Sequence, residues 1–415
     1  MKTNNNNIPA YRFQGYTDAW ELRKLGELGT LKNGMNFSKD AMGIGFPFIN
    51  LQNIFGKNIV DVSQLGLAKA SSIQLKNYNL QKGDVLFVRS SVKLEGVGEA
   101  AIVPKNLENT TYSGFIIRYR DSFGLDYNFK RFTFGTSNIR NQIMSQATDS
   151  ANKNISQQVL AELDILVPSL PEQSAIGTFF STLDRHITLH QRKLDTLKEQ
   201  KKTYLKLLFP AKGQTKPALR FQGFEDDWEE VTLGEVVSIS SGYTGDATLN
   251  NGKYKLTRIE TISEGKVDVS RTGFSNELPD EKYRLNFGDI LFSNINSLVH
   301  IGKVAIFNTM EEVFHGINLL RLVPNKDLIN PYFIYYQLVT ESKKNWSKAH
   351  ANQAVNQASI NQTSLSTQKI SFPTLPEQEV IGTFFSTLDQ EIAQVEDKLA
   401  SLKEMKKTLL RKLFV

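Results

Sequence analysis

The sequence predicts a mixed α/β protein in which two globular domains are separated by two long heptad helices that form an intramolecular coiled coil. Three observations predict this architecture. Sequence blocks of the first half of the chain recur in the second half at an interval of about 205 residues. Each copy ends in a long amphipathic segment, and the region between the matched flanks contains short apolar runs typical of strands. We therefore expect an internal repeat with pseudo-twofold symmetry.

The first repeated element is a proline-led segment. Residues 168–184 read PSLPEQSAIGTFFSTLD and residues 373–389 read PTLPEQEVIGTFFSTLD, with 14 of 17 positions identical. Two further blocks repeat in the same order, an Arg-Phe-Gln-Gly segment and a Gly-Asp turn before an apolar strand: 12–27 with 220–235, and 83–87 with 288–292. The interiors, 28–160 and 236–365, diverge, which favours one shared frame holding two different inserts.

A heptad seam follows each proline-led segment, since apolar residues recur at spacings of three and four. The seam residues of the first copy are Leu183, Ile187, Leu194, Leu197, Tyr204 and Leu208, and those of the second are Leu388, Ile392, Val395, Leu399, Leu402, Leu409 and Leu413. Each helix is expected to run for about 39 residues, or roughly 58 Å. We expect the two seams to pack on each other as an antiparallel or crossed pair, and the alternative is that each helix packs only on its own domain.

Two lysines interrupt the seam at equivalent positions, Lys201 and Lys406. They have two interpretations, because a polar seam residue can restrict the register of a coiled coil or can extend its ammonium group to solvent. The second interpretation is favoured.

Each interior predicts three strands and a capped helix. The strands are expected at 85–88, 100–103 and 115–119 in the first copy, and at 290–292, 304–307 and 319–323 in the second. A helix is expected to begin after Asp126 and another after Asn330, because Asp and Asn are favoured at helix N-caps.

Composition excludes several classes of protein. The chain has 415 residues, 40% of them hydrophobic, which is enough for sizeable cores and excludes wholesale disorder. Cysteine is absent, so disulfides, thiol nucleophiles and cysteine-ligated zinc are excluded. The Asn-rich start, 1–10, does not resemble a secretory signal, and no run of about 18 apolar residues predicts a membrane span. We expect a cytoplasmic protein without a membrane partner.

Motifs for catalysis and cofactor binding are missing from the sequence. There is no phosphate-binding loop, no His-Glu-x-x-His pattern and no EF-hand, and the five histidines lack metal-ligand spacing. Gly43-Ile44-Gly45 matches only a fragment of a nucleotide or AdoMet loop, and Asn330-Pro331-Tyr332-Phe333 lacks the second proline of the motif of amino-methyltransferases. We therefore predict no catalytic residue, no metal site and no cofactor site.

A nucleic-acid partner is suggested by the residues that remain. The net charge is +6, which fits such a partner without proving one. Arg reads guanine, Asn and Gln read adenine, and Lys and Ser contact phosphates. Side chains of these types gather in the divergent interiors, and the alternative is that they belong to ordinary solvated loops. The DNA-contact candidates are Arg89, Ser90, Ser91, Lys93, Ser137, Asn138, Arg140, Asn141, Gln142, Asn294, Asn296, Ser297, Lys343, Lys344, Asn345, Trp346, Lys348, His350, Asn352 and Gln353.

Taken together, these motifs resemble the specificity subunit of a type I restriction-modification enzyme. The resemblance is carried by the Arg-Phe-Gln-Gly blocks, the two Gly-Asp turns and the two Pro-Glu-Gln segments with the long helices behind them, and it covers the whole chain. It implies two target recognition domains, 12–167 and 220–372, and two conserved spacer helices, 168–215 and 373–415.

The resemblance also implies a function. Each recognition domain would read one half of a bipartite, asymmetric site in double-stranded DNA. Two methyltransferase subunits would bind AdoMet, and restriction or motor subunits would use ATP and Mg, so this chain would be non-catalytic and bind no cofactor. Two alternatives stay open: a self-contained methyltransferase or nuclease, and a coiled-coil scaffold that does not bind DNA.

Overall fold

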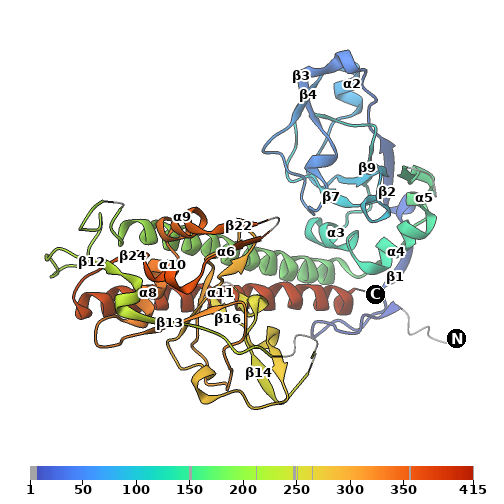
Figure 1. Cartoon of the computed structure of the whole chain (residues 1–415). Helices are drawn as coiled ribbons and strands as arrows, with labels where there is room; N and C mark the ends of the chain where they lie inside the picture. The colour runs from blue at the N-terminus through green and yellow to red at the C-terminus, as the bar shows by residue number, and fades with distance from the viewer. Residues whose placement is uncertain are drawn as a thin grey trace. The chain divides into compact units, whose positions relative to one another are not determined.

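The computed structural model describes residues 7–148, 152–211, 213–245, 249, 251–263, 265–354 and 357–414, so residues 1–6 of the Asn-rich start lie outside the description. The chain forms two compact units: unit 1 joins 1–191 to 397–415, and unit 2 comprises 192–396. Each unit contains one divergent interior and a part of both long helices (Figure 1). The mixed α/β class expected from the sequence is confirmed.

An antiparallel four-stranded sheet forms the centre of unit 1. Its strands lie in the order β2 (Gly29–Asn33), β9 (Ile116–Asp121), β5 (Val85–Val88) and β7 (Ala100–Ile102). Every residue of β5 is buried, because this inner strand has a hydrophobic cluster on each face. Val85 and Phe87 join one cluster and Leu86 and Val88 join the other, as the two-residue period of a strand requires.

Unit 2 repeats this sheet. The equivalent strands lie in the order β13 (Val237–Ser241), β21 (Leu320–Pro324), β18 (Ile290–Phe292) and β20 (Val304–Ile306), and β16 (Lys266–Val267) and β15 (Ile262–Ser263) extend it. The six strands expected from the sequence are present, with ends that differ from the expected ones by at most two residues.

The remaining strands form small sheets at the edges of the two units. Those of unit 1 are β1 (Glu21–Lys24) with β11 (Asp164–Val167), β6 (Ser90–Ser91) with β10 (Lys153–Asn154), and β3 (Met42–Ile49) with β4 (Gly66–Ala68) and β8 (Thr111–Tyr112). Those of unit 2 are β12 (Glu229–Thr232) with β24 (Lys369–Phe372), β14 (Tyr254–Leu256) with β17 (Gly273–Ser275), and β19 (Ile295–Asn296) with β23 (Gln357–Ser359) and β22 (Asn352–Ala354).

The helices of the two units also correspond, except that one helix of unit 1, residues 72–77, has no α-helical counterpart among the described residues of unit 2. Those of unit 1 are α1 (Leu25–Leu28), α2 (Ser72–Asn77), α3 (Tyr127–Thr133), α4 (Ser137–Gln146) and α5 (Gln157–Ala161), and those of unit 2 are α7 (Leu233–Val236), α8 (Pro331–Leu338), α9 (Glu341–His350) and α10 (Gln362–Ser366). Both predicted caps are confirmed: the side chain of Asp126 accepts a hydrogen bond from the Phe129 N–H, and that of Asn330 accepts one from the Phe333 N–H.

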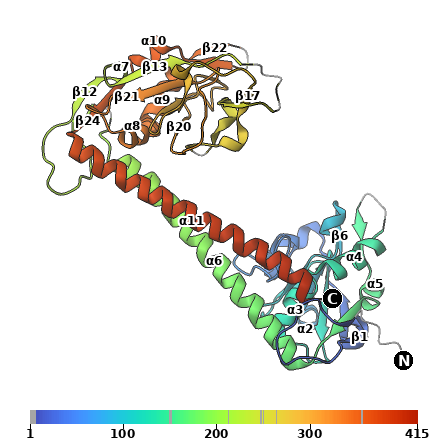
Figure 2. The ribbon, with the colours of Figure 1, turned by 90° about the horizontal axis from the view of Figure 1, so that it is seen from below.

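Two helices of the expected length are shared by the units: α6 (Leu170–Leu207) and α11 (Leu375–Leu413), with 38 and 39 residues. Residues 170–191 of α6 and 397–413 of α11 belong to unit 1, and residues 192–207 and 375–396 belong to unit 2. Within each unit the two segments lie side by side (Figure 2). Each predicted seam residue is buried or half-buried.

The pairing of the two helices is antiparallel in both units. In unit 1, Asp184 of α6 contacts Lys406 of α11, and Gln191, further along α6, contacts Lys403, earlier in α11. In unit 2, Lys193 contacts Glu391 and Tyr204 packs against Phe384. The helices therefore pack on each other, although the first turns of each also contact the core of the unit in which it begins, as Phe180 does with Phe132.

The two seam lysines do not extend into solvent, contrary to the interpretation favoured from the heptad pattern. Lys406 forms an ion pair with Asp184 at 2.6 Å, and Lys201 forms one with Asp389 at 2.5 Å. Their side chains are only 24% exposed, because each is directed across the seam toward a carboxylate of the partner helix. A heptad pattern identifies the position of such a lysine but not the acid that it meets.

The repeated polar motifs stabilise the frame. Arg12 forms a bidentate ion pair with Glu172 at 2.7 Å, and Arg220 forms the equivalent pair with Glu377. Both carboxylates are 1% exposed, and hydrogen bonding to Glu172 raises the pKa of Arg12. The Arg-Phe-Gln-Gly block and the Pro-Glu-Gln segment are thus repeated together because they contact each other.

Candidate nucleic-acid interface

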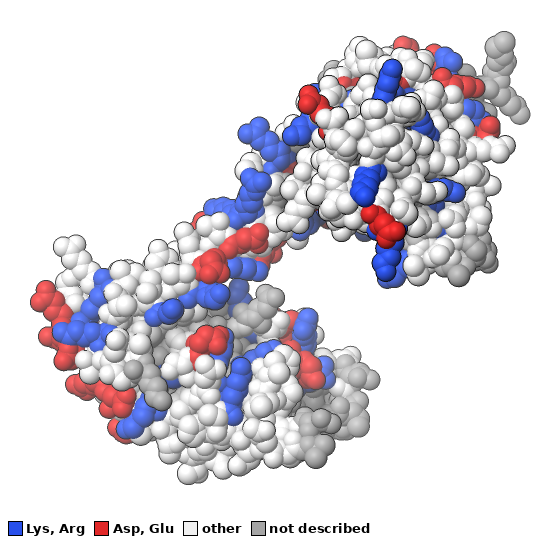
Figure 3. Space-filling view, turned by 90° about the horizontal axis from the view of Figure 1, so that it is seen from above, with Lys and Arg blue, Asp and Glu red and all other residues white. Residues whose placement is uncertain are grey.

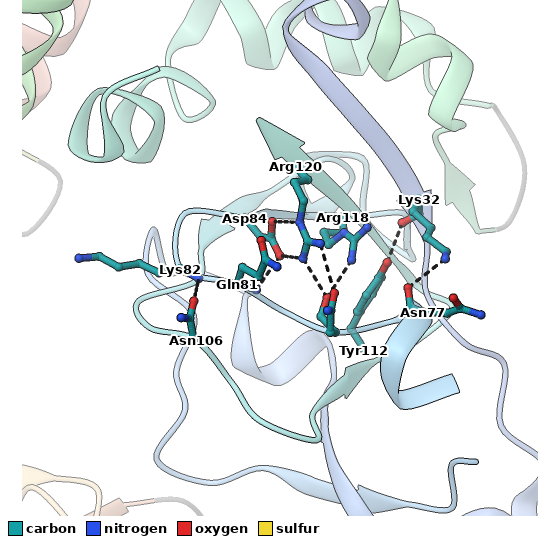
Figure 4. Close-up of polar contacts among 10 residues, drawn as sticks. Lys32, Asn77, Gln81, Lys82, Asp84, Asn106, Tyr112, Arg118 and Arg120 are labelled. Carbon is teal, nitrogen blue, oxygen red and sulfur yellow. Dashed lines mark hydrogen bonds and ion pairs between the residues drawn. The ribbon is translucent and has the colours of Figure 1, made fainter. Parts of the chain in front are cut away.

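The Gly-Asp turn anchors the strand that leads to the first group of candidates. Gly83 adopts a φ of 90°, and the carboxylate of Asp84 accepts hydrogen bonds from Arg120 Nε at 2.8 Å and Nη2 at 2.6 Å (Figure 4). In unit 2, Arg321 Nη2 lies 2.6 Å from the carboxylate of Asp289. Because each ion pair fixes the start of a buried central strand, it also fixes where the loop after that strand begins.

In unit 1 this loop carries Arg89, Ser90, Ser91 and Lys93. The two serines form β6, which pairs with β10, so that Ser91 lies opposite Lys153 and Ser90 opposite Asn154. Lys93 is exposed, whereas Arg89 is half-buried and its Nη1 donates to the Gly114 carbonyl at 3.4 Å. The tertiary structure therefore places two further polar residues, the basic Lys153 and the amide Asn154, beside this candidate loop.

Helix α4 supplies the other candidates of unit 1, and they divide into two groups. Arg140 donates to the carbonyls of Val97 and Glu95 at 2.7 and 2.6 Å, and burial lowers its pKa. Gln142 exchanges two hydrogen bonds with the backbone of Asp164 in β11. These two side chains hold the loop and the frame together, whereas Ser137, Asn138 and Asn141 are exposed.

In unit 2 the sheet β19-β23-β22 brings together candidates that are far apart in sequence. Asn296 on β19 and Gln353 on β22 both lie opposite Ala358 of the middle strand. Asn296 donates to Ser293 Oγ at 3.1 Å and accepts from the Ser297 N–H at 2.8 Å, and Asn294 donates to the Ile360 carbonyl at 3.3 Å. Ser297, Asn352 and Gln353 are exposed.

Helix α9 carries the remaining candidates and likewise has an internal and an external set. Lys343 donates to the Lys369 carbonyl and burial lowers its pKa, so this lysine serves the frame. Trp346 packs against the main core of unit 2, and its ring stacks on that of His350 with centroids 4.2 Å apart. Lys344, half-buried, lies 3.6 Å from Glu341, whereas Asn345, Lys348 and His350 are exposed.

In each unit a glycine lies where the candidate loop meets the candidate helix. Gly98 and Gly302 adopt φ values of 67° and 76°, which favour glycine. A Cβ on Gly98 would lie 2.5 Å from Ile143 of α4, and one on Gly302 would lie 2.7 Å from Ser347 of α9. Each helix can therefore pack directly on the loop that precedes it in the chain.

We call these regions platform 1 (residues 89–98, 137–146 and 153–154) and platform 2 (residues 293–302, 341–354 and 357–359). They gather all of the candidates, although the candidates come from separate segments of each interior. On the face drawn in Figure 3, positive and negative side chains are interspersed. In sequence, both platforms have an excess of positive charge. Platform 1 has four Lys or Arg residues and one acidic residue, Glu95, and platform 2 has three Lys residues and one acidic residue, Glu341.

Polar, positively charged surfaces of this kind suit a polyanion with hydrogen-bonding edges. Among the described residues there is no group of three or more His, Cys, Asp or Glu side chains placed to hold a metal ion. No helix in the described part of the chain is long and apolar enough to cross a membrane.

Sequence reasoning missed some residues of the platforms. Lys153 and Asn154 reach platform 1 only through strand pairing. Val92 and Val299 lie within the candidate loops but have no polar group that a sequence pattern would single out. Both valines are largely exposed, at 78% and 75%, and this exposure can be recognised only in the tertiary structure.

A known family model matches both copies of the repeat. The model of the type I restriction modification DNA specificity domain matches residues 17–199 and 225–404. A putative type I restriction enzyme MjaX specificity subunit from Methanocaldococcus jannaschii is 43% identical over 194 residues, which cover 46% of each chain. The matched region thus spans about half the length of that curated relative.

Other similarities cover nearly the whole chain. The type I restriction enzyme StySPI specificity subunit of Salmonella potsdam is 21% identical over 413 residues, covering 96% of this chain and 89% of the relative. The crystal structure of a type I restriction-modification system S subunit from M. genitalium aligns with a TM-score of 0.63 and 19% identity, covering 98% of this chain and 99% of that one. The second similarity bears on the fold alone.

Proposed function

The chain belongs to the type I restriction-modification DNA specificity family, and from that membership we propose that it is the DNA-reading subunit of a type I restriction-modification complex. It recognises a bipartite, asymmetric site in double-stranded DNA, with one target recognition domain for each half. The domains are 12–167 and 220–372, and the conserved spacer helices are 168–215 and 373–415.

One observation carries this proposal. Two interiors that diverge in sequence present Lys, Asn, Gln and Ser side chains at topologically equivalent platforms on a repeated frame. Phosphates bind the basic side chains, and base edges in the major groove bind amides and guanidinium groups. Because the frame is repeated while the platforms differ, the two half-sites differ in sequence, which makes the complete site asymmetric.

The chemistry of the complex belongs to other subunits. Two methyltransferase subunits bind AdoMet and methylate adenine, and restriction or motor subunits use ATP and Mg. A target adenine has to leave the duplex to reach a methyltransferase pocket, so the specificity subunit holds the DNA while the partner acts. The chain is itself non-catalytic, binds no cofactor and acts in the cytoplasm.

The test is to co-express the chain with the methyltransferase encoded beside it, in a host without adenine methylation, and to map methylated adenines over the genome. The expected result is a two-part motif with a fixed gap and unlike halves. A stable complex that produces no motif would reject the proposal. Calorimetric binding of AdoMet or a divalent metal by the isolated chain would favour a self-contained enzyme, and absence of salt-dependent binding to duplex DNA would favour a scaffold.

A further inference from the structure

Each platform has an exposed valine at its tip. Val92 is 78% exposed and Val299 is 75% exposed, and each lies in the turn between the buried central strand of its unit and the next strand of the sheet. A second apolar side chain accompanies each valine: Leu94 is 37% exposed and Leu298 is 39% exposed. Single exposed apolar residues are common on proteins. An exposed valine and leucine on each of two loops that are otherwise unlike in sequence is a feature that needs a reason.

In unit 1 the valine borders an open cavity. The cavity has a volume of about 580 Å³, and its wall includes Val92, Phe55 and Phe115 with the two serines of β6. Its charged wall residues are Lys93, Glu95 and Glu99, and Glu99 accepts a hydrogen bond from the Gly56 N–H. Phe115 is 58% exposed and Phe55 is 36% exposed. An apolar surface therefore lies directly beside the hydroxyl and ammonium groups of platform 1.

In unit 2 the valine lies in a segment without negative charge. Residues 290–303 and 342–362 contain no Asp or Glu, whereas the exposed Lys303 and Lys348 lie within them. The exposed Ser297 precedes Val299 and supplies a hydroxyl group, and the exposed Asn352 and Gln353 on β22 supply amide groups. A molecule that binds at platform 2 is thus expected to be negatively charged and to offer both polar and apolar groups to the same small surface.

Duplex DNA meets this description through one chemical group. In the major groove the 5-methyl group of thymine is the apolar feature among the base-edge donors and acceptors, and it is flanked by phosphates. We propose that Val92 and Val299 are specificity-determining residues that contact thymine 5-methyl groups, one in each half of the recognition site. This inference rests on the proposed function and adds the kind of base that each tip reads.

The test begins with the half-sites obtained by methylation mapping. Duplexes are made in which one thymine at a time is replaced by deoxyuridine, which removes only the methyl group. Their binding to the purified complex with the methyltransferase is measured by fluorescence anisotropy. One replacement in each half-site should weaken binding about fourfold, the change expected for losing one buried methyl group.

Substitutions then assign each methyl group to its valine. Val299→Ala should weaken binding of the thymine duplex in one half-site and leave binding of the matching deoxyuridine duplex unchanged, since the methyl group is already absent there. Val92→Ala should do the same for the other half-site, so each variant is the control for the other. Ile73→Ala, at a residue 71% exposed on α2 outside the platforms, should leave both half-sites unchanged.

Several results would overturn the inference. They are half-sites without thymine, deoxyuridine duplexes that bind like the thymine duplexes, and Val→Ala variants that weaken both kinds of duplex equally. If the variants instead release the methyltransferase while DNA preference stays the same, the tips are protein-docking sites. If the unmodified complex yields no bipartite motif, the proposed function itself fails, which is a distinct outcome.

Discussion

The ammonium group of Lys406 lies 2.6 Å from the carboxylate of Asp184, so that an ion pair joins α11 to α6 within unit 1. The repeat copies this relationship in unit 2, where Lys201 of α6 pairs with Asp389 of α11. Asp184 also accepts from Arg131 of α3, whereas Asp389 accepts from the hydroxyl of Tyr336 on α8. Each carboxylate therefore connects the helix pair to a recognition domain, and it uses a different domain residue in each copy.

Asp184→Asn should destabilise unit 1 more than Lys406→Met does. The aspartate variant leaves both Lys406 and Arg131 without their carboxylate, with an expected cost of about 2–3 kcal/mol, whereas the lysine variant leaves the Asp184–Arg131 pair intact and should cost about 1 kcal/mol. Urea unfolding of the purified chain measures the difference. Lys407→Met, at an exposed position of α11, is the matched control, and equal effects of all three variants would contradict this role of Asp184.

Phe414→Ala should destabilise unit 1 by about 3–5 kcal/mol, because large-to-small changes in an aromatic core leave a cavity. Phe414 follows the end of α11 and packs against Trp20, Phe129 and Phe180. Phe209→Ala should act similarly on unit 2, where Phe209 packs against Trp228, Phe333 and Phe385. Thermal melting should separate both variants from Met405→Ala, which changes a 45% exposed residue of α11; a melting temperature equal to that control would disprove the packing role.

His315 should make stability depend on pH. Its side chain is 0% exposed, and burial lowers its pKa from 6.5 to about 4. Between these values the unfolded chain binds more protons than the folded one, so stability is full above about pH 6.5 and falls as the pH drops toward 4, by roughly 2 kcal/mol between pH 7 and pH 5. Urea unfolding at both pH values should show this loss for the unmodified chain and a smaller one for His315→Gln. Equal losses for the two proteins would contradict the prediction, because they would mean that folding does not lower the pKa of His315.

Removing one heptad from both long helices should shorten the gap between the half-sites by about three base pairs. Deleting 190–196 together with 395–401 takes equivalent residues from α6 and α11 and keeps the seam in register. Seven residues correspond to roughly 10 Å of helix, and DNA rises about 3.4 Å per base pair. Methylation mapping measures the gap, and an unchanged gap would show that the helices do not set it. Deletion from α6 alone should disrupt the pairing instead.

Lys348→Ala should reduce the salt dependence of DNA binding. Lys348 is exposed on platform 2, and removing one phosphate-binding ammonium group should lower the slope of log affinity against log salt by about 1. Anisotropy titrations from low to physiological salt measure the slope. Lys326→Ala, at an exposed lysine of unit 2 outside the platform, is the control and should leave the slope unchanged. Equal slopes for both variants would remove Lys348 from the interface.

The polar candidates show where sequence reasoning stops. Arg140 and Gln142 have the side chains of base readers, yet they bind backbone groups of Glu95, Val97 and Asp164. Lys343 likewise binds the carbonyl of Lys369. A polar side chain in a variable segment can serve either solvent-facing recognition or an internal bond, and only the position of its distant partner decides between them.

The sequence by itself determined the repeat, the central strands, the two helix caps and the heptad seams, because each depends on residues close together in the chain or on a pattern that appears twice. The tertiary structure alone decided that the helices pair antiparallel and that the seam lysines meet aspartates on the opposite helix. It also decided that the segments 295–296, 352–354 and 357–359 form one small sheet. These features depend on contacts between residues tens to hundreds of positions apart, which local propensity and periodicity do not encode.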